Sequence, residues 1–150
     1  MPTNNTNNNS VGLAVVTHVD YGASLLRAAE HIVGPIQDCV SIQVDINNDV
    51  QETLKRLNDA VALLDSGAGV LVLTDMFGGT PTNLSLSLLG RGGNIEVLTG
   101  VNLPMLLKVL SNRQKPLEEI SELACEAGRE GIAVAGDILR SKIKKSDDQP

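Results

Sequence analysis

Two long apolar runs stand out along the chain, and each ends in a residue that can do chemistry. Residues 11–18 end in His18, and residues 70–75 end in Asp75. Neither run alternates between apolar and polar side chains, which is typical of a strand buried on both faces, and such strands belong to parallel sheets. We therefore expect two central strands with His18 and Asp75 at their carboxyl ends.

Two further strands and several helices complete the pattern. Residues 40–44 alternate apolar and polar side chains, which predicts a strand with one less buried face, nearer a sheet edge; residues 95–99 predict a fourth strand. Apolar side chains recur at helical spacing between the strands, and Thr80 and Asn102 are the expected N-caps of two helices with early prolines. The helical segments are 22–33, 49–65, 80–90, a helix after Asn102, and 116–128.

Alternating strands and helices predict an α/β fold, a three-layer sandwich with a mainly parallel, doubly wound sheet. The length of 150 residues fits one domain, which we place at 11–140. Residues 1–10 are rich in Asn and predict a disordered tail, and residues 141–150 predict a flexible charged tail. Periodicity leaves residues 131–135 open, as either a last short strand or a helical continuation.

The amino-acid composition limits the kinds of molecule that the chain is expected to bind. The net charge is −6, so no basic surface for a phosphate backbone is expected. The chain has one Tyr, one Phe and no Trp, so no platform for base stacking is expected either. Together these observations exclude nucleic acid as the main partner. No signal peptide or membrane-length apolar run is found, which predicts a cytoplasmic protein without membrane insertion. Cys39 and Cys125 are far apart in sequence and are expected to be reduced packing residues.

The two strand ends suggest a site. Carboxyl ends of parallel strands meet at one sheet edge, where a carboxylate can hold one imidazole nitrogen and leave the other as a nucleophile. The turn Gly78-Gly79-Thr80 opens a helix whose free N–H groups favour an anion, with a hydroxyl as a further donor. His18 and Asp75 with this turn therefore predict a phosphate site.

Each part of this site also has a purely structural interpretation. A histidine at a strand end is often solvated, an aspartate can cap a turn, and Gly-Gly-Thr-Pro can be an ordinary strand-to-helix turn. Only their joint placement favours a functional site. His31 falls on a polar helix face and is assigned to solvent; with two histidines and no ligand cluster, we expect no metal, and no cofactor motif is found.

Three segments resemble the mannose-type family of IIA components of the bacterial sugar phosphotransferase system. They are Val15-Val-Thr-His18, Val72-Leu-Thr-Asp-Met-Phe-Gly-Gly-Thr-Pro-Thr-Asn83 and Glu96-Val-Leu-Thr-Gly-Val-Asn-Leu-Pro-Met-Leu106. A similar Ala127-Gly-Arg-Glu-Gly131 adds support, and the resemblance covers about Val11 to Ile138.

The resemblance implies a phosphotransferase, a phosphohistidine carrier without a cofactor. In that family the residue matching His18 accepts a phosphoryl group from the phosphocarrier protein HPr and passes it to a IIB component. The residue matching Asp75 holds the other ring nitrogen, and the one matching Thr80 helps to hold the phosphoryl group. The family also implies a homodimer and a C-terminal antiparallel strand, which makes residues 131–135 a strand candidate that exchanges between subunits.

One position departs from the family. Glycine usually follows the histidine, whereas Val19 and then Asp20 follow it here. A β-branched residue disfavours a positive φ, so the loop after His18 is expected to differ, and the Asp20 charge is expected to disfavour a phosphorylated state.

Other functions stay open from the sequence. The chain could be a regulatory protein that binds an enzyme or transporter according to its phosphorylation, or the phosphoryl-donor subunit of a dihydroxyacetone kinase. Met76 and Phe77 could form an apolar docking rim for HPr or pack beneath the loop.

Overall fold

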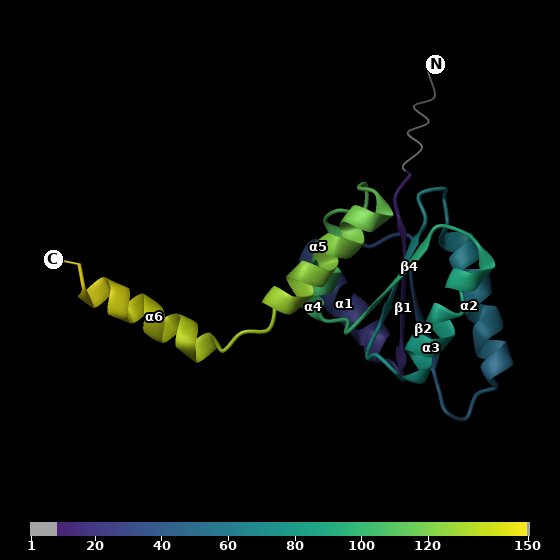
Figure 1. The fold of residues 1–150 in the computed structure, drawn as a ribbon, viewed down its shortest axis with the longest axis horizontal. Coiled ribbons are helices and arrows are strands. Elements are labelled where there is room, and N and C mark those ends of the chain that lie inside the picture. Colours follow the sequence, from purple (N-terminus) through teal and green to yellow (C-terminus); the bar gives the residue numbers. More distant parts are fainter. Residues whose placement is uncertain (1–8, 150) are drawn as a thin grey trace, which may run out of the picture.

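Four parallel strands form the centre of the fold in the computed structural model, which describes residues 9–149 (Figure 1). They are β1 (Gly12–His18), β2 (Cys39–Val44), β3 (Val70–Thr74) and β4 (Ile95–Thr99). The strand order is β2-β1-β3-β4 and every pairing is parallel. The predicted α/β fold is therefore confirmed, with β1 and β3 at the centre and β2 at an edge.

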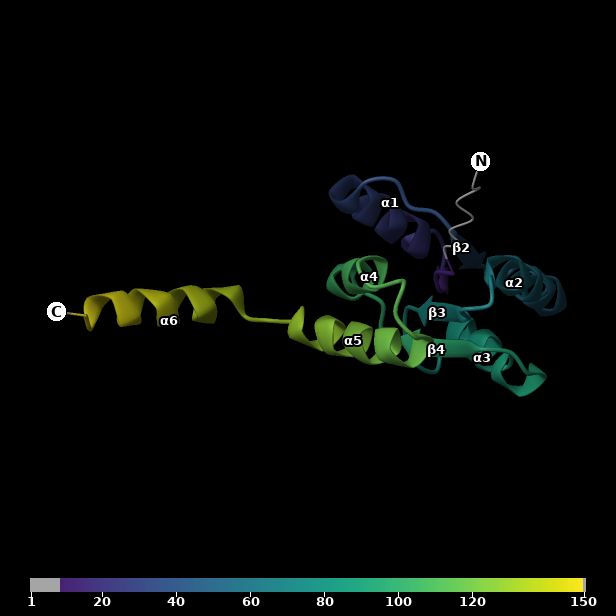
Figure 2. The same ribbon diagram turned by 90° about the horizontal axis from the view of Figure 1, so that it is seen from above.

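Helices cover both faces of the sheet, as Figure 2 shows. The helices α1, α4 and α5 lie on one face, and α2 and α3 lie on the other. Their bounds are α1 (Tyr21–Val33), α2 (Val50–Leu64), α3 (Thr80–Leu86), a 3₁₀ turn η1 (Leu89–Arg91), α4 (Leu103–Leu110), α5 (Leu117–Glu130) and α6 (Ala135–Asp147). None of them, within the described residues, is long and apolar enough to cross a membrane.

The central strands are apolar throughout because each face of the sheet has its own core. Side chains alternate across a strand, so successive residues of β1 and β3 enter opposite cores. Leu13, Val15, Leu71 and Leu73 pack on the side of α1, α4 and α5, whereas Ala14, Val16, Val70 and Val72 pack on the side of α2 and α3, and all eight are fully buried. The edge strand β2 instead buries Ile42 and Val44 and exposes Gln43, as its alternation predicts.

The start of α3 differs from the prediction. Gly79 is the N-cap, Thr80 is the first helical residue, and no side chain caps this helix. Gly78 has φ 83°, a left-handed conformation that glycine adopts without strain, and it turns the chain directly before the observed cap, Gly79. At α4, by contrast, the Asn102 side chain accepts a hydrogen bond from the N–H of Met105, which confirms that predicted cap.

The predicted C-terminal antiparallel strand is not formed within this single chain. Within the described residues the sheet has four strands, and residues 132–134 belong to none of them. They lead to α6, which projects away from the sheet in both views (Figures 1 and 2). No strand edge of the same chain lies beside residues 132–134, so they gain no ladder of hydrogen bonds. Residues 141–147, expected in a tail, are helical in α6, and residues 1–8 of the expected N-terminal tail lie outside the described residues.

Arg113, which the sequence pattern does not single out, joins the amino end of β1 to the loop before β2. Its guanidinium donates hydrogen bonds to the carbonyl of Val11 from Nε at 2.8 Å and to that of Asp38 from Nη2 at 2.9 Å. Nη1 donates to the Gln37 carbonyl, and the Arg113 carbonyl accepts from the Val11 N–H at 3.0 Å. One cation thus satisfies the carbonyls of two segments far apart in sequence.

We expect Arg113→Ala to lower the free energy of unfolding by about 2 kcal/mol, because hydrogen bonds to a charged group are lost and partly buried carbonyls are left without a donor. Urea unfolding followed by circular dichroism measures this. Arg91→Ala is the control, since Arg91 is exposed, and it should change stability by less than about 0.5 kcal/mol. Equal effects for both variants would contradict the role given to Arg113.

Candidate functional site

His18 and Asp75 meet at the carboxyl edge of the sheet because β1 and β3 are adjacent and in register, with Val16 opposite Thr74. The Nδ1 atom of His18 lies 2.7 Å from Oδ2 of Asp75, and the backbone N–H of His18 donates to the same oxygen at 2.9 Å. The other carboxylate oxygen accepts from the N–H of Met76 at 2.9 Å. The two predicted residues are therefore brought together, and Asp75 holds both the backbone and the ring of His18.

The ionisation of Asp75 determines which ring nitrogen is free. Partial burial alone would raise the pKa of this carboxyl, but the hydrogen bonds from the His18 backbone and ring, with a smaller one from the Met76 N–H, lower it below its ordinary value. An ionised carboxylate only accepts hydrogen bonds, so in the neutral imidazole Nδ1 carries the proton and Nε2 has the free lone pair.

The imidazole faces solvent while its partner does not. The His18 side chain is 47% exposed and that of Asp75 is 12% exposed. Within residues 9–149 no group is hydrogen-bonded to Nε2 of His18. This arrangement shields the Asp75 carboxylate and leaves the imidazole accessible from solvent.

The glycine turn after Asp75 lies against the imidazole. A Cβ atom on Gly79 would come 3.0 Å from Cε1 of His18 and 3.3 Å from Cγ of Met76, so a glycine allows this close approach. Thr80 is exposed, and its hydroxyl has no partner among the described residues. Gly79 thus lies against the His18 ring, and Thr80 lines the same pocket as His18 with a hydroxyl that no described residue occupies.

Three threonines that sequence reasoning missed hold the strand ends in place. The Thr82 hydroxyl donates to the Met76 carbonyl at 2.6 Å, which leaves it to accept from the Thr74 hydroxyl at 2.7 Å. The Thr17 hydroxyl accepts from the N–H of Gly22 at 2.8 Å, at the start of α1. All three are buried. Their only sequence signal is that Thr17 and Thr74 immediately precede His18 and Asp75.

Val19 adopts the backbone conformation that a glycine would favour. Its φ is +42°, and its side chain is 58% exposed. The loop therefore keeps a left-handed residue after His18, contrary to the expectation that a β-branched side chain would change it, and the result is local strain. Asp20 is the N-cap of α1, is exposed, and makes no side-chain capping bond.

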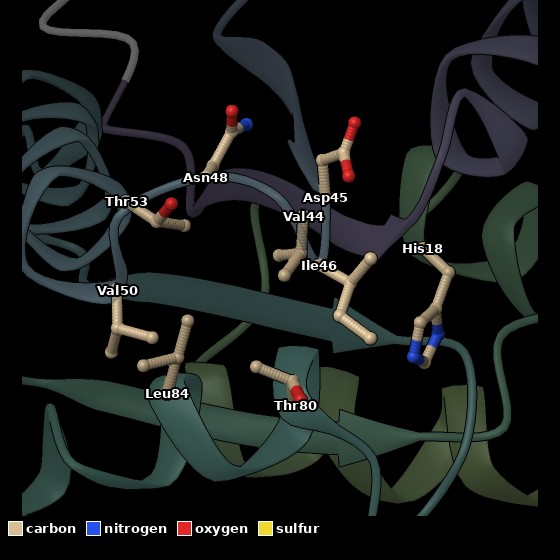
Figure 3. A pocket seen from close by; sticks show the side chains of 9 residues that line it. All are labelled: His18, Val44, Asp45, Ile46, Asn48, Val50, Thr53, Thr80 and Leu84. Carbon is tan, nitrogen blue, oxygen red and sulfur yellow. The ribbon is translucent and has the colours of Figure 1, made fainter.

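A pocket of about 180 Å³ adjoins the imidazole (Figure 3). His18 stands at one end and Val50 at the other, and apolar side chains from the end of β2, the loop after it and α3 form much of the lining. These include Val44, Ile46 and Leu84, with Thr80 among the polar lining residues. Around the site Ile46 is 97%, Phe77 77% and Met76 57% exposed. Met76 and Phe77 therefore do not pack beneath the loop.

Other chemistry has little support within residues 9–149. No three His, Cys, Asp or Glu side chains gather closely enough there to hold a metal ion. His31 is exposed, as predicted. Cys39 and Cys125 are free and half-buried. Burial raises the pKa of the Cys39 thiol to about 11, against the opposing effect of Arg113, so this thiol is a poor nucleophile.

Comparison with known proteins agrees with this geometry. The model of the family described as "PTS system fructose IIA component" matches residues 12–125. The chain belongs to the mannose-type IIA family of the phosphotransferase system. It is 31% identical over 125 residues to the mannose-specific EIIAB component of Escherichia coli K12, covering 82% of this chain and 39% of that protein, so the chain spans about two fifths of that relative's length.

Smaller relatives and solved structures match the IIA chain over more of their length. The fructose-specific EIIA component of Bacillus subtilis is 28% identical over 104 residues, which is 69% of this chain and 71% of that one. The crystal structure of EIIA from Streptococcus agalactiae has a TM-score of 0.77 and 26% identity, covering 85% and 98% of the two chains. A IIA protein associated with the fucose utilization operon of Streptococcus pneumoniae has a TM-score of 0.75 and 27% identity, covering 87% and 96%.

We expect the Asp75 carboxylate to make stability depend on pH. Because its pKa is lowered in the folded IIA chain, the ionised form stabilises the fold fully above its ordinary pKa, and that contribution is lost as the pH falls through the lowered value. The difference in unfolding free energy between wild type and Asp75→Asn should shrink between about pH 5 and pH 2. Urea unfolding at a series of pH values tests this, with Asp20→Asn as a control that should change stability little; a pH-independent difference for Asp75→Asn would contradict it.

We expect Val19→Gly to raise the free energy of unfolding by about 1 kcal/mol, because glycine relieves the positive φ at a cost in chain entropy smaller than the strain. Thermal and urea unfolding measure the change. Val33→Gly is the matched control at the end of α1, where an ordinary helical valine is replaced, and it should be destabilising by a similar amount. Destabilisation by both would show that Val19 is unstrained.

Proposed function

We propose that this IIA chain is a phosphocarrier that accepts a phosphoryl group on Nε2 of His18 from HPr and passes it to a IIB component during sugar uptake. The observation that carries the proposal is the 2.7 Å hydrogen bond between Nδ1 of His18 and Asp75. It fixes the tautomer with a free lone pair on the exposed nitrogen, which is what a nucleophilic histidine requires. Family membership supports the general role in phosphoryl transfer.

The transfer is a displacement at phosphorus. The lone pair on Nε2 attacks the phosphorus atom in line with the departing nitrogen of phosphorylated HPr, and that nitrogen leaves with its bonding electron pair. The proton on Nδ1 stays in place, so the His18 ring gains positive charge as the new N–P bond forms. The Asp75 carboxylate, 2.7 Å away, stabilises that charge. The reverse displacement passes the group to the IIB component.

The turn from Gly78 to Thr80 is the proposed cradle for the three phosphoryl oxygens. Gly79 already approaches the imidazole closely, and the exposed Thr80 hydroxyl has no partner among residues 9–149. The first N–H groups of α3 lack partners within the helix, as in any helix. Donors that are already in position stabilise the transferring group without reorganisation.

An apolar rim surrounds the site and is the proposed docking surface for HPr and the IIB component. It is formed by Val19, Ile46, Val50, Met76 and Phe77, which are 50–97% exposed. Val19, Ile46, Met76 and Phe77 come from the loops that follow β1, β2 and β3, and Val50 is the first residue of α2. A partner must bring its own phosphoryl-carrying group against His18, and burial of this rim would contribute to that contact.

A homodimer is the proposed state of the IIA chain, as the resemblance implies. The strand β4 is an edge of the four-stranded sheet. Val134 has an extended backbone, and Ile132 and Val134 are 80% and 66% exposed. A strand edge and an extended apolar segment are complementary, so pairing of residues 131–135 with β4 of a second copy would cover both. No observation favours the regulatory or the dihydroxyacetone kinase alternative.

The proposal is tested by incubating the chain with radiolabelled phosphoenolpyruvate, enzyme I and HPr. We expect an acid-labile, base-stable label at one histidine. His18→Ala should abolish labelling, because the nucleophile is lost, and His31→Ala should label at the wild-type rate. Asp75→Asn should label at least about a hundredfold more slowly, since the tautomer is no longer fixed and the developing charge is not stabilised.

The outcomes separate the roles of these residues. Undiminished labelling of His18→Ala, or loss of label in His31→Ala alone, would overturn the site. Normal labelling of Asp75→Asn would remove the orienting role of Asp75 and leave His18 as the phosphorylated residue.

A further inference from the structure

The helix α6 has no partner within its own chain. None of its residues is buried, and Ile138, Leu139 and Ile143 are 50–61% exposed. These three recur at spacings of one, four and five residues, so they lie along one face, which Ser146 shares. Ser141 is two residues from both Leu139 and Ile143 and lies on the opposite side. The helix is amphipathic, and its apolar face is uncovered.

A helix of this size needs a surface to pack on. Isolated helices shorter than about 12–15 residues are marginal in water, because the cost of nucleation is recovered only by tertiary contacts. The helix has 13 residues. Its internal support is modest, with one ion pair between Arg140 and Asp137 and a bond from the Ser141 hydroxyl to the Asp137 carbonyl.

The charge of α6 is opposite to that of the whole chain. The helix contains four basic residues and only two acidic ones, although the chain has a net charge of −6. The basic residues are Arg140, Lys142, Lys144 and Lys145. Within residues 9–149 none of the three lysines has an acidic partner. Lys142 lies on the apolar face between Ile138 and Leu139, and Lys145 borders that face beside Ile138. The surface that receives α6 is therefore expected to combine apolar area with acidic side chains.

The outer face of α5 has this character. Glu122, Glu126 and Glu130 stand four residues apart on one stripe, and with Cys125 and Arg129 they line a shallow hollow of about 520 Å³. The three glutamates are exposed and have no ion pair within the described residues. Like charges at this spacing repel, so nearby cations would stabilise α5. The lengths also agree, since helices of 13 and 14 residues are each about 20 Å long.

The α6 of the same chain does not reach this hollow. Gly131 ends α5 packed against Pro104, and a Cβ there would come 2.6 Å from the proline ring. This contact fixes the direction in which the chain leaves α5. Figure 2 shows α6 continuing outward from the end of α5, without folding back on it. An anionic membrane is disfavoured as the partner, because the negative charge of the rest of the chain opposes its approach.

We propose that α6 of one copy docks on the acidic stripe of α5 in a second copy, with its apolar face in the hollow beside Cys125 and its lysines against Glu122, Glu126 and Glu130. The proposal rests on the homodimer proposed above only in requiring a second copy. Each copy carries both surfaces, so a two-fold arrangement satisfies both helices at once and closes the assembly.

Disulfide trapping in the full chain tests this contact, because Cys125 lies in the hollow. Cys39→Ser removes the other thiol, and Ser146→Cys then places a thiol on the apolar face of α6, whereas the matched control Ser141→Cys places it on the opposite face. Under mild oxidation we expect Ser146→Cys to form a covalent dimer about tenfold faster than Ser141→Cys, because a disulfide forms only when the two Cα atoms come within about 7 Å. Adding Cys125→Ser should abolish the product.

Sedimentation of the unoxidised chain separates this contact from the dimer itself. A dimer in solution with no preferential trapping through Ser146→Cys overturns the docking of α6 and leaves the homodimer intact, whereas a monomer overturns both. A fast-migrating monomeric disulfide would show that α6 folds back on its own α5, which also overturns the proposal. Labelling of His18 is measured separately, so a failure of the phosphocarrier role is distinguishable from any of these results.

Discussion

The hydrogen bonds from His18 to Asp75 are the interaction on which the site depends. Both the backbone N–H and the ring of His18 donate to one carboxylate oxygen. A single acceptor therefore fixes where β1 ends, which way the imidazole points and which ring nitrogen is free. These bonds exist because β1 and β3 are adjacent in the sheet although the two residues are 57 positions apart. The order of the strands is thus part of the chemistry of the site.

Buried threonine hydroxyls beneath the site hold the ends of β1 and β3 in fixed positions. Thr74 and Thr82 tie the end of β3 to α3, and Thr17 ties the end of β1 to α1. Each hydroxyl satisfies a neighbour that burial would otherwise leave without a partner, so the layer is rigid as well as neutral. Neutrality matters here, because a buried charge below the site would change the electrostatics of the pair between His18 and Asp75.

The sequence predicts the strands and the central pair well, because both depend on local patterns and on one general rule of parallel sheets. The sequence is a poorer guide to features that depend on a specific tertiary contact. The predicted Thr80 cap is wrong because the turn at Gly78 places the cap at Gly79, one residue earlier. Arg113 escapes notice because its partners are backbone carbonyls, which leave no sequence pattern. Val19 keeps a strained φ because the backbone N–H of His18, just before it, is held by Asp75.

The separation of β1 and β3 in sequence also has a consequence for how the protein is made. Closing a long loop before two parallel strands can pair is entropically costly, so such contacts form late in folding. Until β3 joins β1, His18 is an ordinary flexible histidine with no carboxylate to orient it. If His18 is the phosphoryl acceptor proposed above, a nascent or damaged chain would be a poor acceptor, because the pairing of His18 with Asp75 forms only when the fold is complete.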